Sequence, residues 1–158
     1  MAITDVLDHL PSDHLRRDAL LAIFETTVSA IACVQDPASG VWYQVLDQGD
    51  RAGNYLESSA SCMFVYAIAK GVRKGYLGQE VLAVARRGYE GILRQFVEVD
   101  ELGLVNLSGI CSVGGLGGTP YRDGSFAYYV SEKVVSNEYK GVGAFILASV
   151  EMERVEQP

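Results

Sequence analysis

Two segments of the chain are apolar on most sides at helical spacing, and they constrain the fold more than any other feature. The first covers residues 20–34 and repeats every three or four positions through Leu20, Phe24, Thr27, Ile31 and Val34. The second covers residues 55–76, where small residues precede Met63, Phe64, Ala67 and Ile68. Because helices that are apolar nearly all round are buried, we expect both segments to pack inside a helical assembly.

Three other segments have a helical pattern of a different kind. Residues 3–10 form a short amphipathic stretch that Pro11 ends, and residues 82–96 combine one narrow apolar stripe with a charged face. A further helix is expected from about residue 137 onwards. The alternation of buried with amphipathic helices predicts stacked helical hairpins, arranged in a toroid with an inner and an outer ring.

The connection between the last two helices is long and glycine-rich, from about residue 98 to residue 136. Loops of this length in compact domains are either functional or disordered, and its aromatic residues favour an ordered surface. Residues 104–107 alternate weakly, which is compatible with a short β-hairpin. The fold class that follows is all-α with one long connection at one end of the hairpins.

Length and charge limit the classes of function. The 158 residues fit a single domain, and 20 acidic against 13 basic residues give a net charge of −7. This balance argues against nucleic acid and against an anionic membrane surface as partners. We expect three reduced thiols rather than disulfides, and the first fifteen residues do not follow the pattern of a secretory signal. A cytoplasmic location is therefore expected.

Several candidate motifs for binding or catalysis lack a residue that their chemistry requires. The run Gly114–Gly118 is rich in glycine, but Pro120 takes the place of the third glycine of a dinucleotide loop. His9 and His14 stand on either side of a proline break with no matching ligand, and no nucleophile elbow is present. We therefore expect neither a metal site nor an organic cofactor.

A cluster of carboxylates beside aromatic residues is the remaining candidate for chemistry. Asp47, Asp50 and Glu57 lie near Trp42 and Tyr43 in the sequence. Glycosidases use this combination, because a ring stacks on the sugar while a carboxyl group transfers the proton. Solvated loop carboxylates give the same pattern, so both interpretations stay open.

The chain resembles the C-terminal portion of the unsaturated rhamnogalacturonyl hydrolases, glycoside hydrolase family 105. The matching runs occur in the same order as in the family and cover almost the whole chain. The runs that carry it are GVWYQVLD (40–47), YLESSASCMF (55–64), KGVR (70–73), GYL (75–77), GGLGGTPYRDGS (114–125), YYVSE (128–132) and KGVGAF (140–145).

The resemblance implies an (α/α)6 barrel of twelve helices in six hairpins, of which residues 1–158 form the C-terminal part. It also implies a reaction on short pectin fragments whose terminal galacturonyl unit has a C4=C5 double bond. An Asp protonates the double bond, water adds at C5, and rhamnose is released without a cofactor. The small oligosaccharide is the implied partner.

One departure from the family leaves the catalytic residue unassigned. The proton-donating Asp and a Trp-Ala-Arg-Gly-Asn-Gly-Trp segment belong upstream of the region that this chain matches. The expected substrate-binding residues are Trp42, with one ring face open to a cleft, Tyr43, Gln44 and Glu57. Packing remains the alternative for Trp42, and stabilisation of a helix N-terminus remains the alternative for Glu57.

Two hypotheses about function follow. The chain is either part of the hydrolase, active only with the rest of the toroid, or an inactive structural and self-associating module. A partial ring would expose the inner helices that carry Phe24, Ile31, Phe64 and Ile68. An exposed apolar strip of that size predicts a homo-oligomer.

Overall fold

The computed structural model describes residues 1–157, and most of its regular structure is helical. The helices are α1 (Ala2–His9), α2 (Arg17–Cys33), α3 (Ser58–Arg73), α4 (Leu82–Phe96), α5 (Phe126–Ser131) and α6 (Tyr139–Glu156), with a short 3-10 helix, η1 (Gln79–Val81). The strands are β1 (Val97–Val99), β2 (Val105–Leu107), β3 (Ile110–Cys111) and β4 (Val134–Val135). The predicted all-α class is confirmed.

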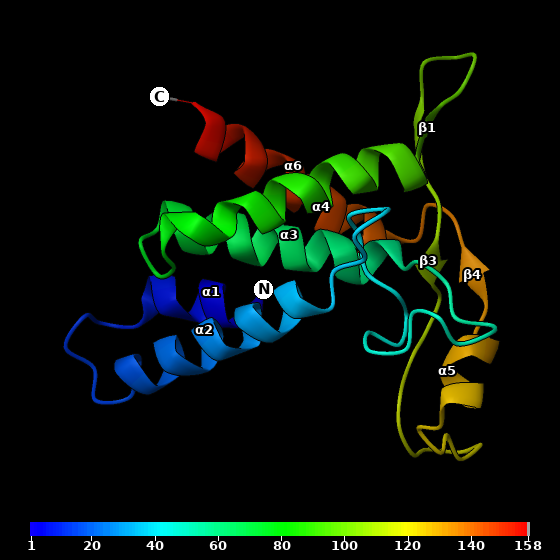
Figure 1. Cartoon of the computed structure of the whole chain (residues 1–158), viewed down its shortest axis with the longest axis horizontal. Coiled ribbons are helices and arrows are strands. Elements are labelled where there is room, and N and C mark those ends of the chain that lie inside the picture. The colour runs from blue at the N-terminus through cyan, green and yellow to red at the C-terminus, as the bar shows by residue number, and fades with distance from the viewer. Residues whose placement is uncertain (158) are drawn as a thin grey trace.

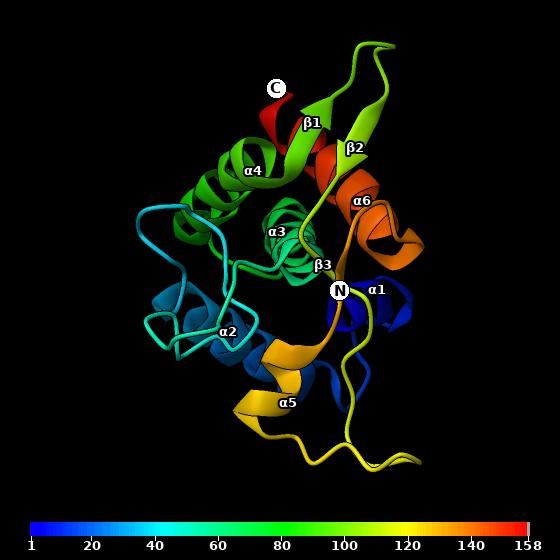
Figure 2. The same cartoon turned by 90° about the vertical axis from the view of Figure 1, so that its right-hand side faces the viewer.

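Helix α3 lies at the centre of the array, with α2 and α6 on opposite sides of it and α4 alongside (Figure 2). Most of its residues are buried, among them Val65, Ile68 and Val72. Small side chains allow this close packing: Gly71 lies against Leu77 and the Phe24 ring. The predicted burial of this segment is confirmed.

Helix α4 is amphipathic, as its pattern predicted. Leu82, Ala85 and Ile92 are buried against the core, whereas Arg86 and Arg94 are exposed. The apolar stripe of the helix therefore packs largely against the core, although Tyr89 is only partly buried and Leu93 is 41% exposed.

The strands form two separate two-stranded antiparallel sheets. Strand β1 pairs with β2 in a hairpin, with Val97 opposite Leu107 and Val99 opposite Val105, which confirms the predicted hairpin. Strand β3 pairs with β4, where Ile110 lies opposite Val135. The second sheet and α5 were not predicted from the sequence.

The connections divide between the two ends of the helices (Figure 1). Short links join α1 to α2 and α3 to α4 at one end. The two long connections, residues 34–57 and 97–138, both lie at the other end, where α3 and α6 begin. This end holds the residues expected to carry function.

Helix α2 differs from its prediction. Its apolar residues were expected to be buried on most sides, but only Phe24 and Val28 are buried, and Ile23 is 54% exposed. The prediction was wrong because burial of the other sides requires neighbours that this chain does not provide.

The apolar strip that was expected to be exposed on the inner helices is instead covered, wholly or in part. Phe24 and Ile68 are buried, while Ile31 and Phe64 are partly buried and pack against the same core. Together with Val28, Ala67 and the first residues of α1 they line a cavity of about 270 Å³ between α1, α2 and α3. Exposed large apolar side chains lie elsewhere on the surface, among them Ile23 on α2 and Ile146 on α6.

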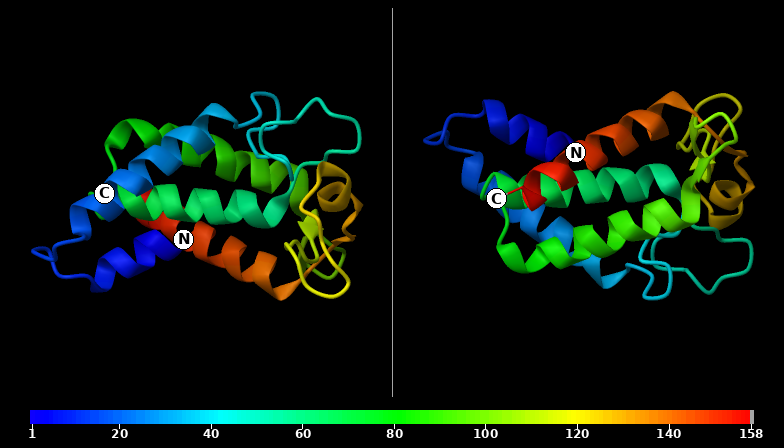
Figure 3. Two further views of the ribbon diagram at one scale, coloured as in Figure 1. Left: turned by 90° about the horizontal axis from the view of Figure 1, so that it is seen from below. Right: turned by 90° about the horizontal axis from the view of Figure 1, so that it is seen from above.

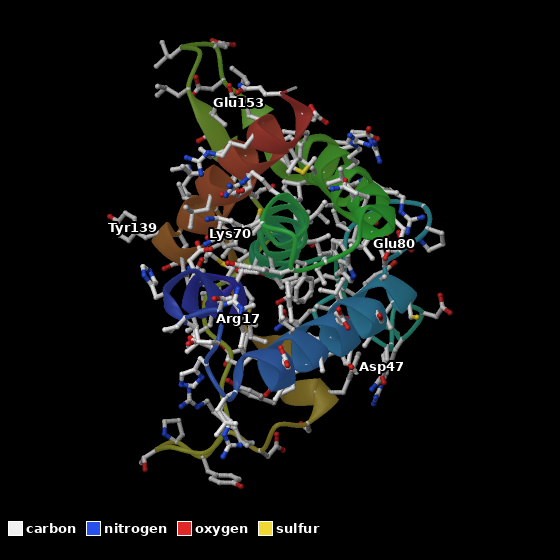
Figure 4. The ribbon with its side chains drawn as sticks, turned by 90° about the vertical axis from the view of Figure 1, so that its left-hand side faces the viewer. Arg17, Asp47, Lys70, Glu80, Tyr139 and Glu153 are labelled. Atoms are coloured by element: carbon white, nitrogen blue, oxygen red, sulfur yellow. The ribbon has the colours of Figure 1, made fainter. Side chains whose placement is uncertain are left out.

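An ion network fastens α1 to α3. The Lys70 ammonium, on α3, lies 2.6 Å from an oxygen of Asp5 and 2.9 Å from an oxygen of Asp8, both on α1. Figure 4 shows Lys70 on the side of α3 that faces α1. The Tyr66 hydroxyl also donates to Asp5 at 2.5 Å. Lys70 is buried, so this pairing replaces the water that its charge would otherwise require.

The network changes the pKa values of its members. Burial would raise the pKa of Asp5, but hydrogen bonds from Lys70 and Tyr66 hold it below its usual value. Hydrogen bonds from Lys70 and then Tyr76 hold the pKa of Asp8 well below its usual range. Burial would lower the pKa of Lys70, yet Asp5, Tyr66 and Asp8 raise it above its usual value.

We predict that the ion network contributes fully to the attachment of α1 from about pH 5 to about pH 9 and that this contribution is lost in acid. A carboxyl with a lowered folded pKa stabilises above its unfolded value of about 3.9, and that contribution disappears as the pH falls through the folded value. Lys70 contributes fully below about 10.4 and is lost only as the pH rises through its raised folded value. Hydrogen exchange of the α1 amides as a function of pH measures this attachment.

The matched variants for this prediction are Lys70→Met and Lys133→Met, the second at an exposed position outside the network. Lys70→Met should speed exchange of α1 at neutral pH and flatten its acid response. Equal behaviour of the two variants would contradict the proposed role of the network.

Among the residues described, no helix combines the length and the apolar character that a bilayer crossing requires.

Candidate functional site

The candidate site lies where the two long connections meet the start of α3. Backbone hydrogen bonds hold them there: the Gln44 amide donates to the Tyr55 carbonyl at 2.8 Å, and the Glu57 amide donates to the Trp42 carbonyl at 2.9 Å. The Ser58 amide donates to the Gly109 carbonyl at 2.9 Å, which brings in the second connection. Residues 42–44 and 55–57 therefore lie side by side.

Trp42 is fully buried, with 0% of its surface exposed. Its ring meets the Phe64 ring edge to face with centroids 5.3 Å apart, and its indole N–H donates to the Ile31 carbonyl at 2.8 Å. A Cβ placed on Gly88 of α4 would lie 3.0 Å from the Trp42 ring, so α4 approaches it closely. The predicted open ring face is wrong, and the packing alternative describes this tryptophan.

Tyr43 is half-buried and lies at the surface beside Trp42. It lines a shallow pocket of about 250 Å³ together with Leu46, Asp47 and Asp50. Asp47 and Asp50 are exposed, as expected of solvated loop carboxylates. Of the predicted aromatic and carboxylate cluster, the structure thus brings Tyr43, Asp47 and Asp50 together and leaves Trp42 in the core.

Glu57 is 2% exposed and occupies the N-cap position of α3. Its carboxylate accepts hydrogen bonds from the Ala60 amide at 2.6 Å, the Ser59 hydroxyl at 2.7 Å and the Cys111 amide at 2.9 Å. Two of these donors belong to the first turn of α3 and the third belongs to β3. The carboxylate therefore satisfies amides at the helix start and ties the second connection to it.

Cys111 and Ser112 are held from three directions, which sequence reasoning missed. Besides the bond to Glu57, the Gln44 side chain donates to the Cys111 sulfur at 3.3 Å. The Lys140 ammonium, from the first turn of α6, donates to the Cys111 carbonyl at 3.2 Å and to the Ser112 carbonyl. The KGVGAF run that opens at Lys140 was the only signal in the sequence, and it did not indicate this contact.

The glycine-rich segment 112–125 extends from this anchor and is ordered by its own contacts. The Arg122 guanidinium donates to the Gly117 carbonyl at 3.0 Å, and the Gly117 amide donates to the Arg122 carbonyl at 2.8 Å. The Gly115 amide donates to the Tyr128 hydroxyl at 3.2 Å. Tyr121 remains 76% exposed, so the segment presents an accessible aromatic side chain.

The second connection also contacts the first through a cation–π pair. The Arg51 guanidinium lies 3.8 Å from the centroid of the Phe126 ring, at the start of α5. Such pairs contribute about 0.5–1 kcal/mol at accessible positions. The pair helps to keep the two long connections together at the end where α3 and α6 begin.

The Cys62 thiol, near the start of α3, is protonated at neutral pH and is therefore not a reactive thiolate. Burial, followed by the charge of Glu57, raises the pKa of the Cys62 thiol to about 12. Burial also raises the pKa of Tyr55, with further contributions from Cys111, Glu57 and Glu132. Neither group is ionised at neutral pH, so neither is a nucleophile there.

Across residues 1–157, no group of three or more His, Cys, Asp and Glu side chains is arranged to hold a metal ion.

The sequence places the chain in a known family. Residues 1–156 match the family model described as Glycosyl Hydrolase Family 88. The chain belongs to this family. Protein Atu3128 of Agrobacterium fabrum and the 24.9 kDa protein in the picA locus of Rhizobium radiobacter are each 41% identical to it over 159 residues. These alignments cover 96% of this chain and 66% of each relative, so the chain spans slightly less than two thirds of their length.

Solved structures of related glycoside hydrolases have the same fold. A family 105 glycoside hydrolase from Clostridium acetobutylicum ATCC 824 is 53% identical and superposes with a TM-score of 0.95. A possible family 105 member from Salmonella enterica is 28% identical, with a TM-score of 0.77. The superpositions cover 98% and 96% of this chain, but only 43% and 36% of those chains. The family 88 chain is therefore an incomplete (α/α)6 toroid, and the resemblance to family 105 is confirmed.

Proposed function

We propose that the chain forms the C-terminal part of a carbohydrate-hydrolysing toroid that hydrates the C4=C5 double bond of unsaturated galacturonyl-rhamnose oligosaccharides. The observation that carries this proposal is the close superposition on the Clostridium family 105 hydrolase over 98% of this chain. The reaction requires general acid catalysis by a carboxyl group. No residue of this chain is assigned that role, because the family's acid belongs to the part of the toroid that this chain does not match.

We propose Tyr43, Gln44 and Glu57 as contributors to the oligosaccharide site. Tyr43 supports this assignment because it lines a surface pocket with two carboxylates. Gln44 and Glu57 act by holding Cys111, which precedes the glycine-rich segment 112–125. The site would then lie at the loop end, close to the starts of α3 and α6.

The first prediction from this proposal is that the 158-residue chain alone has no measurable hydration activity. The reason is that general acid catalysis requires a positioned carboxyl group, which the family supplies from the other part of the toroid. Loss of the ultraviolet absorbance of an unsaturated galacturonyl-rhamnose disaccharide measures the reaction. The longer family 105 hydrolase from Clostridium acetobutylicum is assayed in parallel for comparison.

Turnover of the disaccharide by a pure, sequence-verified sample of the chain would contradict this prediction. In that event the carboxylates Asp47 and Asp50 become the first to replace, because both are exposed beside Tyr43.

A second candidate function is a non-catalytic, self-associating module. Exposed apolar side chains favour it, since Ile23 on α2 is 54% exposed and Ile146 on α6 is 56% exposed. Pairing these surfaces between copies would remove them from water, as the predicted homo-oligomer requires.

A cytoplasmic location is part of the proposal. Cys33, Cys62 and Cys111 are all free thiols, one exposed and two buried, which suits a reducing compartment.

A further inference from the structure

Residues 117–122 form a tight loop within the glycine-rich segment 112–125. The Gly117 amide donates to the Arg122 carbonyl at 2.8 Å, and the Arg122 amide donates to the Gly117 carbonyl at 3.1 Å. Gly117 and Gly118 have φ values of +71° and +87°, in the left-handed region that favours glycine. Both views of Figure 3 place this segment beside α5, at the end of the array where α3 and α6 begin. The loop therefore belongs to the end that holds the candidate site.

The Arg122 side chain lies against the main chain of its own loop. Its Nε–H group donates to the Gly117 carbonyl at 3.0 Å, which orients the guanidinium. A Cβ placed on Gly115 would lie 2.6 Å from Nη1, and a Cβ placed on Gly118 would lie 3.1 Å from Nη2. Glycine at both positions leaves room for the guanidinium, and a larger residue would displace it. This contact gives a structural reason for glycines in the run 114–118, which no nucleotide motif explained.

The Nη1 and Nη2 atoms of Arg122 have no acceptor within residues 1–157. Its side chain donates only through Nε, and no carboxylate forms an ion pair with it. The other two half-buried arginines are satisfied, because Arg17 donates through Nη1 to a backbone carbonyl at 2.7 Å and Arg73 donates through Nη2 to Glu151 at 2.8 Å. Arg122 thus combines an oriented, half-buried guanidinium with N–H donors that remain available to a ligand.

The carboxylate next to Arg122 in the chain has a different partner. Asp123 accepts a hydrogen bond from the Ser125 amide at 2.9 Å, and this bond holds the pKa of Asp123 below its usual value. Asp123 is therefore negatively charged at neutral pH. One guanidinium beside that charge, in a chain of net charge −7, suits a singly charged anion better than a phosphate dianion.

The groups around the free guanidinium nitrogens favour the carboxylate of an acidic sugar. An arginine fork matches the two oxygens of a carboxylate, in a geometry that lysine does not offer. The Gly118 amide has no acceptor in the part of the chain that the structure describes, so it is a further donor. Tyr121 is 76% exposed next to Arg122 and offers an apolar ring face to a sugar.

We propose that Arg122 and the loop around it form a binding site for the carboxylate of a hexuronic acid, the class to which galacturonyl units belong. The Arg122 fork and the Gly118 amide donate to the carboxylate, and the Tyr121 ring lies beside the sugar. Arg122 binds the anion and has no part in proton transfer. The choice of a uronic acid rests on the proposed function, whereas the anion site rests on the geometry of the loop.

The test uses the 158-residue chain and galacturonate, a saturated sugar that cannot undergo the proposed hydration. Two-dimensional proton–nitrogen NMR follows the amides of residues 114–118 and the Arg122 Nε–H group during a titration. Galactose is the matched neutral ligand, because a hydroxymethyl group replaces the carboxylate on the same ring. We expect saturable shifts with galacturonate, centred on Gly118 and Arg122. Galactose should bind about 10-fold more weakly or not at all, since hydrogen bonds to charged groups contribute about that factor.

Variants separate the fork from the charge. Arg122→Gln should weaken galacturonate binding by about 10-fold or more. Arg16→Gln is the matched control, since it removes the same charge from an exposed position just before α2 and should leave binding unchanged. Gly115→Ala keeps the arginine but places a Cβ where Nη1 lies, so it should also weaken binding. Circular dichroism shows whether each variant keeps its helices.

Four results would overturn the proposal. Equal shifts with galactose would remove the role of the carboxylate, and equal weakening by Arg16→Gln and Arg122→Gln would indicate a general effect of charge. Tighter binding of inorganic phosphate at the same amides would replace the uronic acid by a different anion. Absence of saturable shifts with galacturonate would remove the site. The disaccharide assay is independent of all four, because failure of the proposed hydration leaves galacturonate binding unchanged.

Discussion

Replacing Trp42 by Ala should lower the free energy of unfolding by about 3–5 kcal/mol, the range found when a large buried aromatic side chain is removed. The ring is fully buried and packs against Phe64, so its removal leaves a cavity between α3 and α4. The loss also leaves the Ile31 carbonyl without the indole N–H that lies 2.8 Å away. Urea unfolding followed by far-ultraviolet circular dichroism measures the change, because Trp42 is the one tryptophan available for fluorescence.

Two further variants make the Trp42 result interpretable. Trp42→Phe retains much of the ring but loses the N–H, so we expect a smaller loss of about 1–3 kcal/mol. Tyr121→Ala removes an aromatic side chain that is 76% exposed and should change stability by no more than about 0.5 kcal/mol. An unfolding free energy that Trp42→Ala leaves unchanged would restore the hypothesis that this ring serves a ligand.

The sequence predicted those parts of the fold that depend on local periodicity. Helix α4 has a narrow stripe and a charged face, and α3 has an apolar pattern with small residues, so both were identified with their burial. The β1–β2 hairpin followed from the weak alternation of residues 104–107. Each of these elements is specified by side chains close together in the chain.

The parts that could not be predicted depend on distant contacts. Strands β3 and β4 have two residues each and pair across more than twenty positions, so no alternation marks them. Trp42 precedes a helix on an irregular segment, where a single aromatic residue has no period to show which side is buried. Helix α2 has the composition of a buried helix, but within the described residues only Phe24 and Val28 of it are buried.

The candidate site was predicted only in part for the same reason. Tyr43, Asp47 and Asp50 are close in sequence and lie on one pocket, as expected. Lys140 contacts Cys111, which is 29 positions earlier in the chain, and Ser112, which is 28 positions earlier. No motif indicated these contacts. Such contacts require the folded arrangement of α6 against β3, which sequence patterns do not specify.

Glu57→Ala should lower the free energy of unfolding by about 3 kcal/mol. The substitution leaves the amides of Ala60 and Cys111 without an acceptor, and each unsatisfied buried group costs about 1–3 kcal/mol. It should also speed hydrogen exchange at Cys111, because the second connection loses one of its three attachments there. Denaturant unfolding and amide exchange by nuclear magnetic resonance measure the two effects.

Glu138 provides the matched control, because it is also a glutamate at a helix N-cap. Its side chain accepts an exposed hydrogen bond from the Lys140 amide at the start of α6, and it makes no hydrogen bond to a strand amide of the kind that Glu57 makes to Cys111. Glu138→Ala should therefore cost only about 1 kcal/mol, as N-cap replacements usually do. Glu57→Gln should fall between the two, since the amide group keeps one acceptor oxygen but turns its NH2 toward a backbone donor. If Glu57 served the sugar and not the fold, Glu57→Ala would match Glu138→Ala in stability and leave exchange at Cys111 unchanged.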